Sequence, residues 1–403
     1  MKNLAAIFLI FNFYFSFSQS QSTLLGSQTS NQLNTITTAV PFLLISPNAR
    51  AGGLGDAGCA STPDVWSNYW NASKNAFIEK NNGIAFSYTP WLKALVPDIR
   101  LFDMSLYKKI GKKSTLSFSA RYFSLGCITF TNIVGNVIGE FHPYEHTENI
   151  SFSHKMKHNF SFGIAGKYIF SQLTNSLVIG NSPTHAGQSL AMDVSCYKRD
   201  TINFIRAGDV FAWGINISNV GSKISYDNSG RRDFLPQNLR IGISYKVDIN
   251  AHNSIELICD ANKLLVPSPP IYAVDSAGNP IKGSNGQFVI SKGKDPNRSV
   301  FNALYSSFYD APGGYKEELR EINIASGIEY WCYKTVAARL GYFFEDPTKG
   351  GRKYFTAGIG LRYEGIELDG SYIFHAGVNS SLQHTWRVSL AYEFDRFRKI
   401  KNQ

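Results

Sequence analysis

The chain has 403 residues, of which 17% are charged and 14% aromatic, and its 40 Lys and Arg outnumber 30 Asp and Glu. Ordinary soluble domains carry about 25% charged residues, so this chain is poor in charge and rich in aromatic rings. A mean hydropathy of −0.16 is too polar for a bundle of membrane helices. The five cysteines are widely spaced and include no CxxC pair, so they indicate neither a disulfide framework nor a zinc site.

The N-terminus has the pattern of a secretory signal. Lys2 is followed by an apolar run from Leu4 to Phe17 and by small residues around Ser18. The run is too short to span a bilayer as a helix, so we expect residues 1–20 to be a cleaved signal peptide. An exported protein rarely meets nucleic acid. The net charge of +10 therefore indicates outer-membrane lipid, including lipopolysaccharide, rather than nucleic acid as a partner.

Beyond residue 80 the dominant hydrophobic period is two. Apolar and polar residues alternate through residues 159–171, 239–247, 336–344 and 386–394. Such alternation predicts strands with one apolar and one polar face. A soluble sandwich would alternate in the same way. Segments of about ten residues, with tyrosines near their ends and tight turns alternating with long loops, favour a transmembrane barrel instead.

We predict an all-β fold, a fourteen-stranded antiparallel transmembrane β-barrel within residues 81–396. An even number of strands closes the sheet and leaves no unpaired edge in lipid. Short turns such as 111–113 and 364–365 are assigned to the periplasmic side together with both chain ends, and the loop 265–319 to the outside. The expected strands lie near 83–91, 98–108, 114–123, 147–157, 159–170, 187–198, 209–219, 236–248, 253–264, 320–332, 334–344, 353–363, 366–375 and 384–394.

The region between the signal and the barrel has a different pattern. Residues 21–37 are rich in Ser, Thr, Gln and Asn, so we expect them to be disordered. Residues 38–80 show no period of two and contain a short helical stretch from about Pro63 to Phe77. We expect residues 38–80 to form a plug in the barrel mouth. A plain periplasmic extension is the alternative.

Several motifs outside the strands resemble one known family. They are Asp260–Pro270, Ser306–Leu319, Arg339–Glu345 and Lys349–Phe355, together with Pro41–Gly58. In this order they resemble the PorV family, also called LptO, outer-membrane proteins of the type IX secretion system with a FadL-like barrel. The resemblance covers nearly the whole chain after the signal. One departure is Tyr69–Ser73, where the family usually has a Trp-Asn-Pro-Ala type stretch.

The resemblance implies a function that composition and periodicity do not. Members of the family bind the C-terminal sorting domain of secreted cargo at the translocon barrel, which is SprA-like. They then pass the cargo to an attachment complex with a PorU-like sortase. No chemistry by the barrel is required, so the resemblance implies neither enzyme activity nor a cofactor. A FadL-like channel for hydrophobic compounds is the alternative.

The inward faces of the predicted strands carry charges of both signs. Because an unpaired charge inside a barrel is costly, we expect a network of ion pairs there rather than a solute pathway. A tunnel for long-chain lipids would be more apolar. The residues of this expected lumen network are Arg240, Glu256, Asp260, Glu329, Arg339, Arg362, Glu367, Asp369 and Arg387.

The loop 265–319 is long for a connection without a function and is rich in aromatic residues. Aromatic side chains on an external loop are plausible anchors for a protein partner. The alternative is a loop that folds over the barrel mouth around a small core of its own. The candidate contacts for cargo or partners are Tyr272, Phe301, Tyr305, Phe308, Tyr309, Asp310, Pro312 and Tyr315.

A lipid A deacylase is a further alternative, because some outer-membrane barrels hydrolyse lipid. Lipid A deacylation would need a nucleophile with a histidine base near the outer rim, and the chain has no GxSxG turn. His142 and His146 would lie in a loop, which provides no helical face to align two imidazoles on a metal. We therefore predict no catalytic residues and no metal site.

Overall fold

The computed structural model describes residues 34–395, apart from 94, 132–133, 175–177, 180–181, 229, 231, 277–278, 285, 376–381 and 383–384. The predicted signal peptide and most of the segment predicted to be disordered lie outside the described residues.

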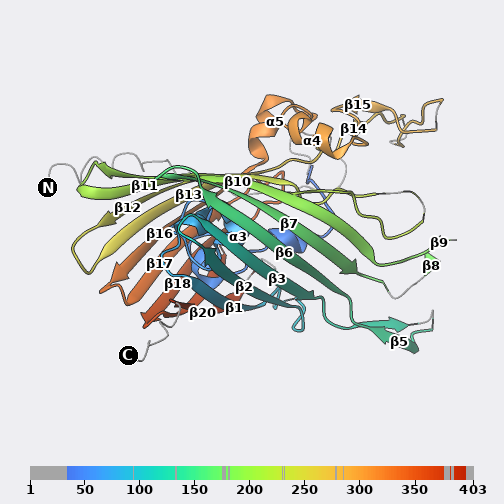
Figure 1. The fold of residues 1–403 in the computed structure, drawn as a ribbon. Helices are drawn as coiled ribbons and strands as arrows, with labels where there is room; N and C mark the ends of the chain where they lie inside the picture. Colours follow the sequence, from blue (N-terminus) through green and yellow to red (C-terminus); the bar gives the residue numbers. More distant parts are fainter. Residues whose placement is uncertain are drawn as a thin grey trace.

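The described residues form one closed antiparallel barrel of fourteen strands (Figure 1). This confirms the predicted fold class. The barrel closes where the first strand pairs with the last, from Asn82 opposite Phe394 to Tyr88 opposite Val388. In order around the wall the strands are β1 (Asn82–Pro90), β2 (Arg100–Ile110), β3 (Ser114–Ser124), β6 (Tyr144–Lys155), β7 (Phe160–Gln172), β10 (Gly187–Asn203), β11 (Ala207–Gly221), β12 (Asn238–Asp248), β13 (Ser254–Leu264), β16 (Ile322–Cys332), β17 (Val336–Phe344), β18 (Lys353–Tyr363), β19 (Ile366–His375) and β20 (Trp386–Phe394).

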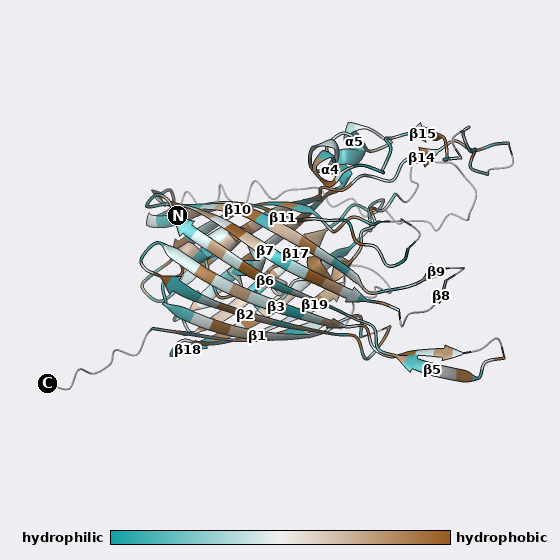
Figure 2. Cartoon of the chain, turned by 45° about the vertical axis from the view of Figure 1, so that its right-hand side comes forward, coloured by the Kyte–Doolittle hydropathy of each residue, from teal (hydrophilic) through white to brown (hydrophobic). Residues whose placement is uncertain are grey.

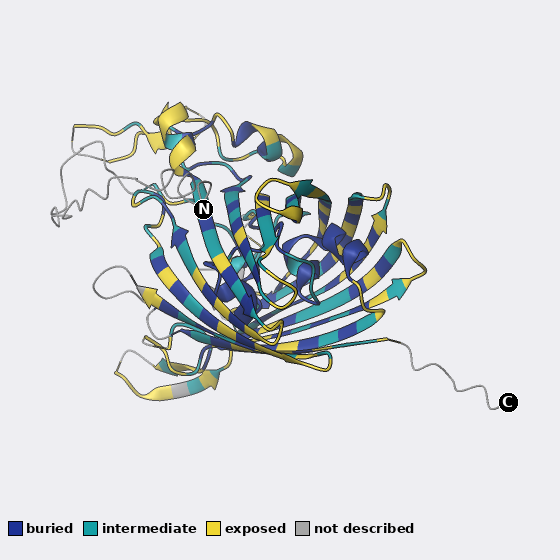
Figure 3. Cartoon of the chain, turned by 90° about the vertical axis from the view of Figure 1, so that its left-hand side faces the viewer, coloured by how far each residue is buried: buried dark blue, intermediate teal, exposed yellow. Residues whose placement is uncertain are grey.

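Alternation along each strand separates an apolar outer face from a polar inner face. In β7, Phe162 and Ile164 are exposed on the outside, whereas Ser161 and Ser171 are buried inside. The same alternation of hydropathy is visible along the strands in Figure 2, and Figure 3 shows buried and exposed residues alternating along the wall. Exposed large apolar side chains on every wall strand except β11 would aggregate in water, so the outer face requires lipid.

The turns at one end of the barrel are short. Tyr333 and Lys334 both have positive φ, of 51° and 54°, and so do Glu364 and Gly365, of 47° and 86°. Two successive positive φ values are the geometry of a two-residue hairpin turn whose twist matches the flanking strands. The other end, called here the outer end, carries the long connections (Figure 1).

The long connections contain structure of their own. Between β3 and β6 a hairpin of β4 (Ile128–Thr131) and β5 (Val137–Phe141) projects beyond the barrel (Figure 1). Another small hairpin joins β8 (Val178–Ile179) to β9 (Ser182–Pro183). The connection from β13 to β16 contains β14 (Ile271–Tyr272), β15 (Ile290–Lys292), α4 (Val300–Ser306) and α5 (Tyr315–Arg320). We call residues 265–321 the external arm.

The N-terminal segment, residues 38–80, lies inside the ring of strands. It consists of η2 (Pro41–Leu44), α2 (Ala49–Gly52), α3 (Ser67–Trp70) and η3 (Ala72–Phe77). Helix α2 contacts β18, β19 and β20, and η3 contacts β6, β7 and β10 across the lumen. The helices enclosed by the wall are buried in Figure 3. None of the helices in the described part of the chain is long and apolar enough to cross a membrane.

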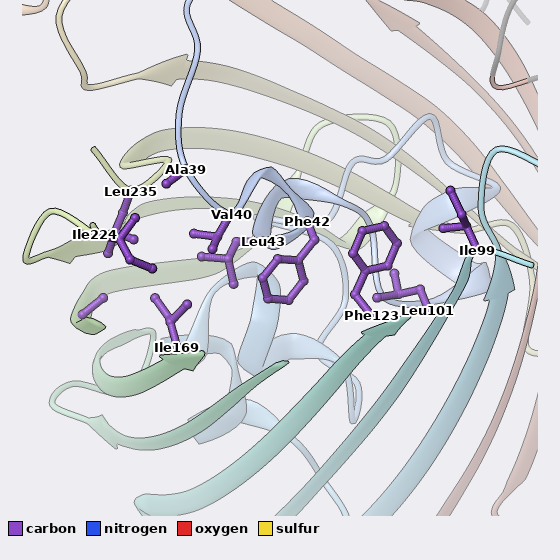
Figure 4. Close-up of a cluster of buried hydrophobic side chains, with 11 residues drawn as sticks. Ala39, Val40, Phe42, Leu43, Ile99, Leu101, Phe123, Ile169, Ile224 and Leu235 are labelled. Carbon is purple, nitrogen blue, oxygen red and sulfur yellow. The ribbon is translucent and has the colours of Figure 1, made fainter. Parts of the chain in front are cut away.

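An apolar cluster fixes the start of this segment to the wall near the outer end (Figure 4). Val40, Phe42 and Leu43 are buried among wall residues that include Leu101 and Phe123. The rings of Phe42 and Phe123 stack with centroids 5.9 Å apart. Burying side chains of this size contributes about 1.5–3 kcal/mol each, so the entry of the segment is held by packing.

The first described residue of the chain lies at the outer end. The backbone N–H of Asn34 donates to the carbonyl of Thr348, and its side-chain amide donates to the carbonyl of Pro269. Both partners belong to connections at the outer end. The chain therefore runs from the outer end through the lumen before it reaches β1. Residues 1–33 lie outside the described residues, so the side on which the N-terminus lies stays a prediction.

Glycines allow the backbone of the N-terminal segment to touch the wall. Gly55 has a positive φ of 70°, and a Cβ added to Gly341 on β17 would lie 2.0 Å from the Gly55 nitrogen. Neither backbone can move away easily, because one belongs to the sheet and the other to a segment packed on both sides. The pair therefore requires glycine on the wall.

We expect Gly341→Ala to destabilise the barrel by about 1–3 kcal/mol, the usual effect of overpacking. Unfolding in urea, followed by the heat-dependent mobility shift of barrels on gels, measures the loss. Gly166→Ala is the matched control, because a Cβ on this β7 glycine meets no atom within 4 Å. Equal stability of the two variants would contradict the close contact at Gly55.

Candidate functional site

The inner half of the lumen, near the short turns, is filled by an ion-pair network centred on Glu329 of β16. Arg50 from the N-terminal segment binds Glu329 with two nitrogens, Nη2 at 2.7 Å and Nε at 2.9 Å. Arg339 Nε lies 2.6 Å from the same carboxylate. All three side chains are almost fully buried. Paired and hydrogen-bonded in this way, buried charges avoid the large penalty of isolated ones.

The network continues across the neighbouring strands. Arg339 also pairs with Asp369 at 2.6 Å, and Arg362 pairs with Glu367 at 2.7 Å. Arg50 further reaches Glu256 at 3.4 Å. Six of the nine residues assigned from sequence to a lumen network are thus joined here, and they are Glu256, Glu329, Arg339, Arg362, Glu367 and Asp369.

The other three assigned residues bind elsewhere. Asp260 accepts hydrogen bonds from the backbone N–H groups of Gly58 and Cys59, at 2.7 and 2.8 Å. Arg387 pairs with Asp56 at 3.1 Å. Arg240 makes no ion pair with any described residue. Its Nε donates to the side-chain oxygen of Asn262, 2.7 Å away.

Sequence reasoning missed the partners that the N-terminal segment supplies, above all Arg50, which also pairs with Asp64 at 2.9 Å. It also missed wall pairs such as Arg121 with Asp103 at 2.6 Å. Asp103 and Arg121 lie directly opposite each other on β2 and β3. Both residues occupy inward-facing positions in the alternating pattern, and this position could have predicted them. No such signal exists for Arg50.

The chemistry of the lumen is that of charge pairing. The carboxylates of the Glu329 network are occupied by arginines and by the N-terminal segment, for example Glu256 by the backbone N–H and hydroxyl of Thr62. Among the described residues there is no group of three or more side chains of the types that hold metals.

A second buried network fastens the external arm to the outer mouth. Lys263, at the end of β13, pairs with Glu318 at 2.9 Å and with Glu321 at 2.6 Å. Lys349, from the next external connection, pairs with Glu321 at 3.0 Å and also with Glu317. All three glutamates lie in or directly after α5, so the helix is held from two sides.

Hydrogen bonds complete the attachment of the arm. The Ser268 hydroxyl donates to Glu321 at 2.6 Å, and the backbone N–H of Ala311 donates to Glu318 at 2.8 Å. Asp310 accepts from the backbone N–H of Ser268 at 3.3 Å. The amide of Asn34 donates to Glu317 at 2.9 Å, which ties the N-terminal segment to the arm. The base of the arm is therefore rigid.

The candidate contact residues of the arm fall into two groups. Phe301 and Tyr305 on α4 and Tyr315 on α5 are widely exposed, at 74%, 59% and 75%, and Phe308 and Tyr309 are exposed beside them. Tyr272 on β14 is exposed and packs against Phe288 with ring centroids 5.6 Å apart. Pro312 is half-buried. Asp310 is buried in the base of the arm, so it is not available to a partner in this conformation.

Between the arm and the lumen network lies a cavity of about 410 Å³, which we call the outer cavity. One wall is the start of the N-terminal segment, from Thr35 to Ser46, and the others are β12, β13, β16 and the connection before β18. Its lining includes Leu44, Ile45, Trp70, Trp91, Arg240, Asn262, Glu321, Phe343, Lys349 and Arg352. It is a partly open, amphipathic recess at the outer mouth.

Two carboxylates in the arm have shifted pKa values. Burial alone would raise the pKa of Glu317, but hydrogen bonds from Lys349, Asn34 and the Gly313 backbone hold that pKa below its ordinary value. Burial raises the pKa of Asp310, which the hydrogen bond from Ser268 only partly offsets. Glu317 is therefore stabilised as a charged group, whereas Asp310 is not.

A closed barrel of fourteen strands, apolar outside and charge-paired inside, is an integral outer-membrane protein. The sequence matches the family described as type IX secretion system protein PorV over residues 27–271, more than half of the chain. The chain belongs to the PorV family, a family of outer-membrane components of type IX secretion.

Solved barrels of similar shape share little sequence with the chain. They include the toluene transporter TodX of Pseudomonas putida, at 10% identity, covering 87% of this chain and 99% of that one with a TM-score of 0.47. The toluene transporter TbuX of Ralstonia pickettii has 10% identity, 88% and 99% coverage and a TM-score of 0.45. A Pseudomonas aeruginosa FadL homologue has 12% identity, 87% and 99% coverage and a TM-score of 0.44. A comparison with curated proteins gives no match.

The pKa of Glu317 predicts how the arm responds to acid. A carboxylate with a lowered folded pKa contributes stability above its ordinary pKa, about 4.3, and loses it as the pH falls through the lowered value. We expect the arm to loosen in that acidic window. A dye on Asn302→Cys of α4, in a Cys127→Ser background, would report this as falling fluorescence anisotropy.

Glu317→Gln is the matched variant for this measurement. It should give low anisotropy already at neutral pH and lose the transition below about pH 4. Protonation of Asp310 favours the folded arm as the pH falls, because its pKa is raised, so Asp310 cannot cause the loosening. An unchanged acid transition in Glu317→Gln would show that the arm is held by other contacts.

Proposed function

We propose that this chain binds the C-terminal sorting domain of proteins secreted by the type IX system. In this proposal it receives cargo at the SprA-like translocon barrel and passes it to an attachment complex with a PorU-like sortase. Membership of the PorV family supports association with the secretion machinery. The single structural observation that carries cargo binding is the external arm, an exposed aromatic surface on a rigid base at the outer mouth.

The arm has the properties of a protein-binding surface. Phe301, Tyr305 and Tyr315 present large rings to solvent from two short helices. Aromatic side chains dominate binding energy at protein interfaces, and a preorganised surface loses less conformational entropy on binding. The buried pairs of Lys263 and Lys349 provide that preorganisation. An arm folded only to cover the mouth would bury these rings rather than expose them.

A channel for hydrophobic compounds is less well supported. Such a compound would have to pass from the outer cavity through the network of Arg50, Glu329 and Arg339, in which the charges are in direct contact. Separating buried partners leaves uncompensated charges and costs about 3–5 kcal/mol for each pair broken. A carrier of cargo at the outer surface requires no such passage.

We expect the triple variant Phe301→Ala, Tyr305→Ala and Tyr315→Ala to lose cargo binding while the barrel remains folded. Central aromatic anchors contribute about 2 kcal/mol or more each, so cargo recovered by affinity purification of the detergent-solubilised protein should fall more than tenfold. In cells, cargo should accumulate in the periplasm with its sorting domain uncleaved, as it should after deletion of the gene.

Tyr333→Ala is the matched control. Tyr333 is 70% exposed but lies in a short turn at the opposite end of the barrel. Normal secretion in the triple variant, with loss of secretion in the deletion strain, would remove the arm from the proposal. Normal secretion in the deletion strain together with lost uptake of a hydrophobic compound would favour the channel. Altered lipid A acylation would favour a deacylase.

A further inference from the structure

The outer cavity contains one buried cation that lacks a carboxylate partner. The acids lining the cavity are neutralised: Asp56 by Arg387, Glu321 by Lys349, and Glu345 by two nitrogens of Arg352 at 2.8 and 2.9 Å. The remaining lining cation is Arg240, and in the described part of the chain no carboxylate lies within ion-pairing distance of it.

Arg240 is held with its terminal nitrogens free. It is the third residue of β12, close to the outer end, and it is 7% exposed. Its Nε is bound by Asn262, and its guanidinium carbon lies 4.6 Å above the ring of Trp70. Asp260 interacts with Arg240 electrostatically, but its carboxylate accepts from the Gly58 and Cys59 backbone instead. No described residue hydrogen-bonds to the two terminal nitrogens, which face the cavity.

Another part of the cavity lining has backbone groups that make no hydrogen bond to a described residue. Thr35, Ile36, Thr37 and Thr38 line the cavity, and exposure alternates along them as in an extended chain. Backbone hydrogen bonds hold Asn34 before them and Ala39 after them. Within the described residues the four between make none. Such a stretch can pair with an added peptide strand.

We propose that the outer cavity receives the last residues of the sorting domain, with the chain-terminal carboxylate bound by Arg240. This rests on the proposed function, and it specifies which chemical group of the cargo is recognised. A sorting domain at the C-terminus of its protein ends in a free carboxylate, and two parallel guanidinium N–H groups match that group in geometry and charge. The extended peptide before it pairs with the backbone of Thr35–Thr38.

A fatty acid would present the same carboxylate, but it fits the remainder of the cavity less well. An acyl chain would leave the backbone groups of Thr35–Thr38 and the side chain of Asn323, which also lines the cavity, without partners. A peptide can satisfy them. A cavity of about 410 Å³ is within the range that encloses a small ligand or a chain end.

The test uses the full-length protein in detergent and synthetic peptides of about the last ten residues of a sorting domain from the same organism. One peptide has a free carboxylate and the other a C-terminal amide. Because a hydrogen bond to a charged group contributes roughly 1.5–3 kcal/mol, amidation should weaken binding about tenfold or more. Arg240→Gln should weaken the free peptide to the same extent and leave the amide peptide unchanged.

Two further variants complete the design. Arg240→Lys keeps the charge and should retain part of the preference for the free carboxylate, and it remains informative if Arg240→Gln fails to fold by the heat-shift assay. Lys246→Gln, on the same strand and the same inward parity but outside the cavity lining, should bind both peptides as the unmodified protein does.

Two results would overturn the carboxylate site: equal affinity for the two peptides, or an effect of Arg240→Gln on the amide peptide as large as on the free one. Arg240-dependent binding of oleate by a protein that binds neither peptide would assign the cavity to a fatty acid instead. Failure of the carboxylate-site proposal can be distinguished from failure of the proposed function. If secretion stops on gene deletion while Arg240 variants secrete normally, only the cavity assignment fails. If deletion leaves secretion intact, the proposed function itself fails.

Discussion

Pairing of charges across the lumen is the interaction on which this structure depends. The alternation that places apolar side chains toward lipid places every other residue of each strand inside, where water is scarce. Without Arg50, which pairs with Glu329, Arg339 alone would have to balance both Glu329 and Asp369. The N-terminal segment therefore does more than occupy space, because it brings a guanidinium that two wall glutamates require. The inner face of the wall and the N-terminal segment therefore balance each other's charges.

The same pairing divides the lumen into two unlike regions. Toward the short turns the charges of the described residues are in direct contact. At the outer mouth the ion pairs lie along the rim. There Lys263, Lys349 and Arg352 bind glutamates of the arm and of the neighbouring connection. Between the two groups lies the outer cavity, in which Arg240 makes no direct ion pair with a described residue. A guanidinium in this position can bind an anion that enters from the outer mouth, as the proposed carboxylate site requires.

Sequence predicted the wall well because alternation and turn chemistry are local. β18 and β19 have the predicted bounds, since Glu364 and Gly365 interrupt two clear alternating runs. β6 begins three residues earlier than predicted, because the polar His146 and Glu148 point outward and obscure the apolar face. The charges that face the lumen were predictable, because alternate residues of each strand point inward. Arg50 was not predictable, because its partner Glu329 is 279 residues away and no periodicity relates a helical turn to a strand.

The arm was only partly accessible from sequence for a related reason. Composition pointed to aromatic anchors, and the exposed rings of Phe301, Tyr305 and Tyr315 have the form such anchors take. Composition could not distinguish these exposed rings from Asp310, which is buried in the base. Nor could it identify the glutamates of α5 that hold the base. That distinction depends on Lys263 at the end of β13 and on Lys349 in the connection before β18, which both pair with Glu321.

The position of Asn34 links the arm to the cavity. Its side chain binds Glu317 of the arm and the carbonyl of Pro269, while its backbone binds Thr348, and the four residues after it form a wall of the outer cavity. The hydrogen bonds that position Thr35–Thr38 therefore also hold the arm. In the cargo-binding proposal, contact with the arm and occupation of the outer cavity would both depend on Asn34.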